Sequence, residues 1–124
     1  MVKSKYSLKT LEISKEIASS CTSCKMCMKE CVMMNDFGES PQDIFGAFLK
    51  DEHINSIIPY SCNLCNKCTT VCPKSLRIPK AFMCMRESII EANGGKSPLK
   101  GHKAVYMHQL LSFGFMKIFT IRRK

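Results

Sequence analysis

Hydrophobic side chains recur at helical spacing in the middle of the chain. The segment Ser40-Pro-Gln-Asp43 has the composition of a helix start, with Ser40 as the N-cap and Pro41 at the first helical position. Apolar residues then follow at intervals of one, three and one along a single face, namely Ile44, Phe45, Phe48 and Leu49. The pattern predicts a helix in the stretch after Ser40.

A second helix is predicted from Pro79 to Asn93-Gly94-Gly95, where the glycines supply a suitable C-terminal cap. The residues that carry its periodicity are Phe82, Met83, Arg86, Ile89 and Ile90. Residues 8–18 show a weaker helical period, and alternating strand patterns are scarce throughout. The chain is therefore predicted to fold as an all-α domain, with the apolar positions, methionines included, lining its core.

The last third of the chain has a different character. Residues 104–119 are rich in large apolar side chains and are flanked by basic residues, which predicts an apolar helix with basic ends. A membrane span is disfavoured, because the 18 residues from Ala104 to Ile121 include His108, Gln109 and Lys117. Packing on its own domain and peripheral contact with a membrane surface are alternatives. We favour docking of a partner subunit by residues 101–124, since a thin domain could not cover so many apolar groups.

Eight of the 9 cysteines fall into two sets with the same internal spacing. Each set reads CxxCxxCxxxC, and the second set is followed by Pro73. Cys84 lies outside both sets, in an apolar helical stretch, where a buried inert thiol is expected. The members of the two sets are Cys21, Cys24, Cys27 and Cys31, and Cys62, Cys65, Cys68 and Cys72.

This spacing discriminates between three kinds of cysteine chemistry. Disulfides are disfavoured, because the cysteine count is odd and cysteines separated by two residues would close strained loops. A structural zinc site is usually built from two CxxC pairs, whereas each set here has three cysteines at three-residue intervals and a fourth after four. Three thiolates within seven residues suit the corners of a cubane, so the sequence predicts two [4Fe-4S] clusters, with zinc as the alternative.

The run of four cysteines followed by Pro is the pattern of bacterial two-cluster ferredoxins, in which the fourth cysteine ligates the other cluster. Applying that rule gives two crossed ligand sets. The first is Cys21, Cys24, Cys27 and Cys72, and the second is Cys62, Cys65, Cys68 and Cys31. If the segment after Cys27 is helical, Cys27 and Cys31 lie about 6 Å apart, and the two clusters are close neighbours.

Together with the helix-forming stretch between the motifs, the phrase Tyr60-Ser-Cys-Asn-Leu-Cys-Asn-Lys-Cys-Thr-Thr-Val-Cys-Pro73 resembles the alpha-helical ferredoxin domain. That domain occurs in the C-type iron-sulfur protein of heterodisulfide reductase, in the cluster-bearing part of its D-type relatives, and in the corresponding iron-sulfur protein of anaerobic glycerol-3-phosphate dehydrogenase. It also forms the C-terminal half of succinate dehydrogenase and fumarate reductase iron-sulfur subunits. The resemblance covers about residues 8–92. Val32 departs from it by standing where many relatives have Pro, and nothing here matches the CCG domains of the longer relatives.

The resemblance implies an electron relay between a flavoprotein or other redox subunit and a catalytic subunit of a heterodisulfide-reductase-like complex in anaerobic metabolism. No catalytic site of the chain's own is expected, because eight thiolates would saturate every iron and because no nucleophile with a base, phosphate-binding glycine loop or flavin fingerprint is present. Residues 1–92 are expected to form the dicluster domain and residues 93–124 the basic apolar tail.

The net charge of +9 points to an acidic partner such as nucleic acid only until its distribution is considered. Residues 1–91 hold 12 basic and 10 acidic residues, whereas residues 92–124 hold 7 basic and no acidic ones. Each all-thiolate cubane adds roughly −2 when oxidised, which leaves the cluster domain mildly acidic and places the positive charge in the tail. This distribution argues against nucleic acid as the partner.

The N-terminal residues show no export signal, so a reducing cytoplasmic location is expected, with membrane association through a partner as an alternative. Two further functional interpretations stay open. One is a free ferredoxin-type shuttle, which the apolar tail disfavours. The other is a structural metal-binding module whose basic tail binds a membrane or nucleic acid.

Overall fold

A computed structural model describes the backbone of residues 5–121 and the side chains of residues 5–114. Between residues 5 and 121 it contains helices, turns and loops and no strand, which confirms the predicted all-α fold. The helices are α1 (Leu8–Ser20), α2 (Met26–Glu30), α3 (Val32–Phe37), α4 (Pro41–Asp51), α5 (Ile57–Ser61), α6 (Lys67–Val71), α7 (Ile78–Ala92) and α8 (Lys100–Ile121).

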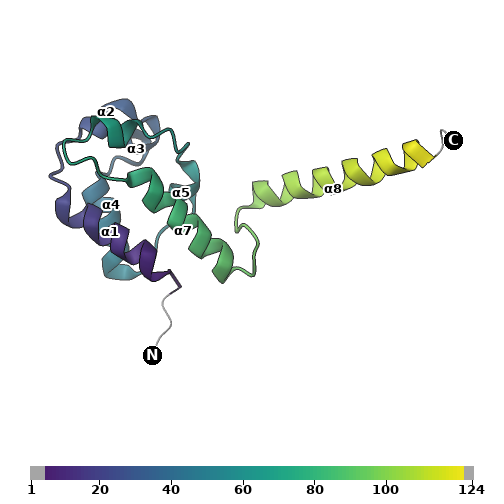
Figure 1. Ribbon diagram of the computed structural model, residues 1–124, viewed down its shortest axis with the longest axis horizontal. Coiled ribbons are helices and arrows are strands. Elements are labelled where there is room, and N and C mark those ends of the chain that lie inside the picture. Colours follow the sequence, from purple (N-terminus) through teal and green to yellow (C-terminus); the bar gives the residue numbers. More distant parts are fainter. Residues whose placement is uncertain (1–4, 122–124) are drawn as a thin grey trace.

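The core of the domain lies where α1 packs against α4 and α7 (Figure 1). Most of the periodic apolar residues of α4 and α7 meet there and are almost fully buried, as predicted from their spacing. The prediction was wrong for Met83, which is 40% exposed on α7, and for Met26, which is 45% exposed beside the first motif. The rings of Phe45 in α4 and Phe82 in α7 lie 5.3 Å apart between centroids. The largest fully buried side chains of the core include Ile17, Met34, Phe45, Phe48, Phe82, Met85 and Ile89.

The start of α4 follows the prediction from its composition. The Ser40 hydroxyl accepts a hydrogen bond from the backbone N–H of Asp43, and the Asp43 carboxylate accepts one from the backbone N–H of Ser40. This reciprocal capping box satisfies two of the N–H groups that every helix start leaves without an intrahelical partner. By contrast, α7 begins at Ile78, one residue before the predicted start, and its N-cap Arg77 makes no side-chain capping bond.

A small buried hydroxyl network joins α1 to α7. The Thr10 hydroxyl donates to the backbone carbonyl of Cys84 at 3.1 Å and lies 3.1 Å from the Ser88 hydroxyl. Thr10 and Ser88 are both buried, so these bonds satisfy polar groups that would otherwise be costly to bury. The Cys84 side chain is itself buried, as expected for a thiol outside the two motifs.

The two cysteine motifs are built on the same backbone plan, displaced by 41 residues. The helix before each motif ends in serine, at Ser20 and Ser61, and a short helix of five residues follows the second cysteine of each motif, as α2 and α6. The two short helices pack against each other, which brings the motifs together although they are far apart in sequence (Figure 1).

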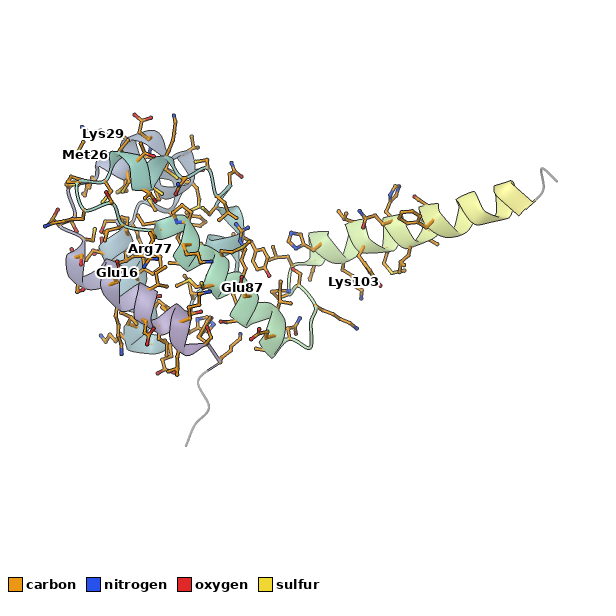
Figure 2. The ribbon with its side chains drawn as sticks, viewed as in Figure 1. Glu16, Met26, Lys29, Arg77, Glu87 and Lys103 are labelled. Carbon is orange, nitrogen blue, oxygen red and sulfur yellow. The ribbon has the colours of Figure 1, made fainter. Side chains whose placement is uncertain are left out.

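The helix α8 projects away from the rest of the domain (Figures 1 and 2). Side chains 101–114 are all exposed, although the His102 ring at the start of α8 contacts the Tyr60 ring of the domain. Large apolar groups are among them, with Leu111 68% and Phe113 74% exposed. No helix among the described residues is long and apolar enough to cross a membrane.

The remaining predictions about the tail are not all covered by the structure. The side chains of residues 115–121 and the basic residues 122–124 lie outside the described part of the chain, as do residues 1–4 of the predicted domain. The helix α7 ends at Ala92, and Gly94 and Gly95 adopt positive φ angles after it, as a C-terminal cap requires. The division of the chain at residue 92 stays a prediction.

Candidate iron-sulfur site

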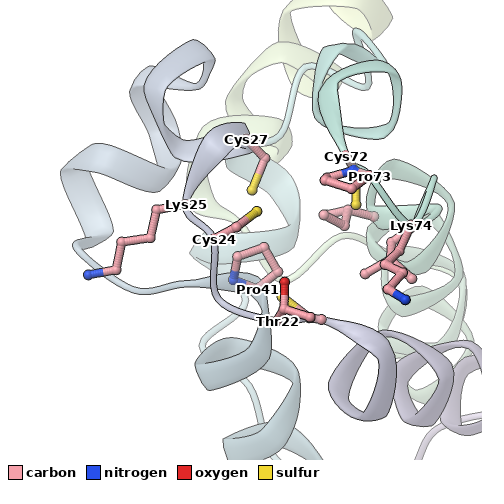
Figure 3. Close-up of a pocket in the computed structure, with 11 residues that line it drawn as sticks. Thr22, Cys24, Lys25, Cys27, Pro41, Cys72, Pro73 and Lys74 are labelled. Carbon is pink, nitrogen blue, oxygen red and sulfur yellow. The ribbon is translucent and has the colours of Figure 1, made fainter.

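A small pocket opens at the first cysteine motif (Figure 3). Cys21, Cys24 and Cys27 line it together with Cys72, the last cysteine of the second motif. Figure 3 shows the sulfurs of Cys24 and Cys27 turned toward the same space, with Cys72 across the pocket from them. The structure therefore brings together the four residues of the first predicted ligand set.

Each of these cysteines is positioned by a different piece of local structure. Cys21 caps the C-terminus of α1, Cys24 lies in the loop, Cys27 lies in α2, and Cys72 caps the C-terminus of α6. Cys72 lies beside the first loop because α6, which ends at Cys72, packs against α2. Pro41 of α4 closes part of the same pocket.

The second motif repeats this arrangement. Cys62 caps the C-terminus of α5, Cys65 lies in the loop, Cys68 lies in α6, and Cys31 caps the C-terminus of α2. Cys31 lies near enough to Cys62 and Cys68 to raise the pKa of both thiols, and Cys27 of the first motif also raises the pKa of Cys68. Cys31 is thus near two members of the second predicted set.

Left-handed backbone conformations shape both loops. Ser23 and Lys25 flank Cys24 with φ angles of 54° and 59°, and Leu64 and Asn66 flank Cys65 with φ angles of 56° and 66°. Residues other than glycine rarely adopt positive φ, and bulky ones such as Leu64 do so at a cost that surrounding structure must offset. The recurrence of the strain at matching positions indicates that both loops must curl around something in the same way.

The burial of the cysteines also repeats. In each motif the second cysteine is exposed, the third is buried, and the first and fourth are partly buried. A group bound inside either loop would therefore lie close to the surface on the side of Cys24 or Cys65. Such a position suits electron exchange with another protein, which does not require the group itself to leave its site.

Burial and crowding raise the pKa values of the innermost thiols. For Cys27 the pKa is raised first by burial and then by the neighbouring Cys21, Cys24 and Cys72. For Cys68 burial and the nearby Cys62 raise the pKa to about 11. A metal that binds such thiols must displace their protons, so metal binding is favoured by rising pH.

At the partly buried Cys62, two groups oppose the effect of burial on the pKa. Burial raises its pKa, whereas the backbone N–H of Leu64, which donates to the Cys62 sulfur at 3.4 Å, and the positive charge of Arg86 both lower it. Both groups stabilise negative charge on this sulfur. The thiolate is the form that ligates metal.

The donor set fits a cubane. Four thiolates around each loop, three from one motif and one from the other, supply the Cys₄ ligation that [4Fe-4S] clusters require. A lone zinc ion takes all its thiolates at about 2.3 Å, whereas a cubane takes one thiolate on each of its four irons.

The sequence analysis placed Arg86 on the periodic face of α7 but did not select it as a site residue, and the structure places it beside the second motif. Its guanidinium donates hydrogen bonds to the backbone carbonyls of Pro59, at 2.7 Å, and Cys62, and it lies 5.4 Å from the centroid of the Tyr60 ring. The available signal was a charged residue within the apolar stripe of α7, between Phe82 and Ile89. Periodicity alone could not show what that residue faces.

Residues 17–76 match the model of a protein family described as 4Fe-4S dicluster domain. The match spans both cysteine motifs. It supports an iron-sulfur, ferredoxin-like domain that binds [4Fe-4S] and serves in electron transfer. Neither a curated protein nor a solved structure matches this chain.

Proposed function

We propose that this chain is an electron-transfer subunit that carries two [4Fe-4S] clusters with crossed ligands. One cluster is held by Cys21, Cys24, Cys27 and Cys72, and the other by Cys62, Cys65, Cys68 and Cys31. The observation that carries the proposal is the pocket that gathers three cysteines of the first motif with the last cysteine of the second. Nothing in the first motif alone would select Cys72.

In this arrangement, each iron of either cluster would have one cysteine thiolate of the chain as its protein ligand. Bound in this way, a [4Fe-4S] group supplies one-electron chemistry and no open iron for a substrate. The chain's own residues then hold the two groups near each other, because α2 contributes Cys27 to one and leads to Cys31 of the other. The role that fits is a relay between redox partners rather than catalysis.

The partners we propose are a flavoprotein or other redox subunit and a catalytic subunit of a heterodisulfide-reductase-like complex. The resemblance of both motifs and their linker to that family supports this assignment. The exposed apolar side chains between residues 105 and 113 of α8 support residues 101–124 as part of the docking surface, because large exposed apolar patches mark interaction sites. A free shuttle would gain nothing from such a helix.

Metal and sulfide analysis tests the cluster content. The full chain purified or reconstituted without oxygen should be brown, with about eight irons and eight acid-labile sulfides per chain, and should give an electron paramagnetic resonance signal on reduction. A colourless protein that holds zinc and resists reconstitution with iron would contradict the proposal. About four irons would leave a single cluster and would contradict the crossed pair.

The docking role is tested by altering the exposed face of α8 in the native host. Replacing Leu110 and Leu111 by Gln should release the partner from the purified complex, because both side chains are exposed and apolar. The matched control is Leu8→Gln, since Leu8 is 78% exposed on α1 at the other end of the chain. Retention of the partner by the α8 variant would contradict docking there, and loss of vesicle binding instead would assign α8 to a membrane surface.

A further inference from the structure

The two proposed cluster sites differ in one half-buried charge. Arg86 lies in α7 beside the second motif, and its guanidinium is tied to the segment that leads into Cys62 by hydrogen bonds to the carbonyls of Pro59 and Cys62. The ring of Tyr60 packs against the same guanidinium, 5.4 Å from its centroid. Because these contacts come from three residues of one segment, the charge is fixed beside the second site.

The first site has a different lining. Apart from the cysteines, its pocket is lined by the buried Pro41, Leu76 and Ile78 and by exposed residues, so among the described residues no partly buried cation lines it. The second site therefore has a fixed charge beside it that the lining of the first pocket lacks.

Other cations near the motifs are placed differently. Lys25 and Lys74 line the first pocket, but both are exposed, and the Lys25 side chain extends away from the cysteines in Figure 3. Lys67 of the second motif is 65% exposed and paired with Glu30. Exposed or paired charges are screened by water and salt, whereas a partly buried charge is screened much less.

We propose that Arg86 raises the reduction potential of the cluster at Cys62, Cys65, Cys68 and Cys31 above that of the first cluster. Reduction adds one electron and hence one negative charge to a site without making or breaking a bond. A fixed positive charge favours the reduced form, as does the Leu64 N–H that donates to the Cys62 sulfur. The second site is then the one that an incoming electron occupies at equilibrium.

The same contacts relate this site to the tail. Tyr60, which packs on Arg86, also meets the His102 ring of α8 edge to face, with centroids 5.3 Å apart. The higher-potential site therefore adjoins the start of α8. If a redox partner binds α8, electrons collect at the site next to that partner.

The inference rests on the two-cluster proposal and is tested on the anaerobically reconstituted full chain. Dithionite supplies the electrons in a potentiometric titration followed by electron paramagnetic resonance. Arg86→Gln should lower the upper of the two midpoint potentials and leave the other unchanged. Arg86→Met removes the same charge, and it replaces Arg86→Gln in the titration if the Gln variant fails to bind eight irons.

Three further variants separate an electrostatic role from a structural one. Arg86→Lys retains the charge and should restore most of the wild-type potential, and Arg77→Gln, which removes an exposed arginine paired with Glu16, should shift neither transition. Cys65→Ser should perturb the same transition that Arg86→Gln moves, which identifies the site.

Two outcomes would overturn the assignment while leaving the two-cluster proposal intact. In the first, both Arg86 variants bind eight irons and keep both wild-type potentials. In the second, the transition that moves is the one perturbed by Cys24→Ser, which changes the first site. Failure of the wild-type chain to bind eight irons would instead count against the two-cluster proposal itself.

Discussion

The first and second cysteine motifs have the same backbone and different surroundings. Both follow a helix that ends in serine, both place two residues with positive φ around the second cysteine, and both continue into a helix of five residues. After the fourth cysteine they diverge, since Val32 begins α3 whereas Pro73 leads into a turn. The loop geometry is thus shared by the two motifs, while the flanking segments differ.

The divergence shows what each half contributes to the other. The first half supplies α1 and the well-capped α4 to the core, while the second supplies α7 and, through Arg86, a charge beside its own motif. In the proposed arrangement, neither half completes a set of four cysteines around its own loop. Removing an element that both sites share is therefore expected to impair both clusters. Removing an element that belongs to one site should impair only the cluster at that site.

The largest effect is expected from replacing the fourth cysteine of either motif by serine. Cys72→Ser should remove or alter the cluster held by the first motif, and Cys31→Ser should do the same for the second, because each fourth cysteine lies beside the other loop. Iron analysis and electron paramagnetic resonance of the two variants, compared with Cys24→Ser and Cys65→Ser, would assign the perturbed signals.

Cys84→Ser is the control for these ligand variants. Its thiol is buried in α7 outside both loops, so both signals should persist. If Cys72→Ser perturbs the same signal as Cys65→Ser rather than that of Cys24→Ser, the ligands are not crossed and each motif holds its own cluster.

Core packing gives the next largest effect. Phe45→Ala removes a completely buried ring that faces Phe82, and such truncations cost about 3–5 kcal/mol. The urea midpoint for loss of helical circular dichroism, measured without oxygen, should fall accordingly. Met83→Ala on α7 is the control, because Met83 is 40% exposed and its truncation should change stability by less than about 0.5 kcal/mol. Equal losses in both variants would contradict the placement of the core.

These core and motif features were largely predictable from sequence. The period of apolar residues located α4 and α7, and the cysteine spacing predicted the four cysteines that line the first pocket, because both signals are local or follow a general rule of ligation. The short helices α3 and α5 were not predicted. Each has only five or six residues, too few to show a period, and their form depends on the segments packed around them.

The positive φ angles and Arg86 could not have been predicted either. Ser23 and Leu64 are not residues that favour the left-handed region, so no compositional signal marks them. The contact of Arg86 with the Cys62 carbonyl joins residues 24 positions apart and depends on how α5 packs against α7. Sequence periodicity reports the face of a helix but not the neighbour on that face.

The capping box offers a smaller effect that distinguishes the two halves. Ser40→Ala should destabilise the protein by about 1 kcal/mol, because the Ser40 hydroxyl accepts from the Asp43 N–H at the start of α4. Ser56→Ala is the matched control, since Ser56 is the N-cap of α5 but makes no capping hydrogen bond. A comparable loss of stability in the control would show that the hydroxyl at Ser40 has no special role.

The same capping box predicts a pH dependence. Hydrogen bonds from the Ser40 hydroxyl and backbone lower the pKa of Asp43 below its ordinary value of 3.8. A carboxyl with a lowered pKa stabilises the fold fully above the ordinary value, and that contribution is lost as the pH falls through the lowered one. The stability difference between wild type and Asp43→Asn, followed by urea midpoints, should therefore be constant near pH 7 and shrink below pH 3.8. A difference that grows on acidification would contradict the capping role.

The smallest effect concerns the ion pair that bridges the two motifs. Lys67 of α6 lies 3.2 Å from Glu30 of α2, but their side chains are 65% and 48% exposed. Such surface pairs contribute about 0–1 kcal/mol, so Glu30→Gln should lower the urea midpoint only slightly, less so in high salt, and should retain both clusters. Glu16→Gln breaks the other exposed pair, with Arg77, away from the α2–α6 contact and should behave alike. If Glu30→Gln alone released iron, the two halves would be held in register by this pair rather than by the helix packing and shared cysteines.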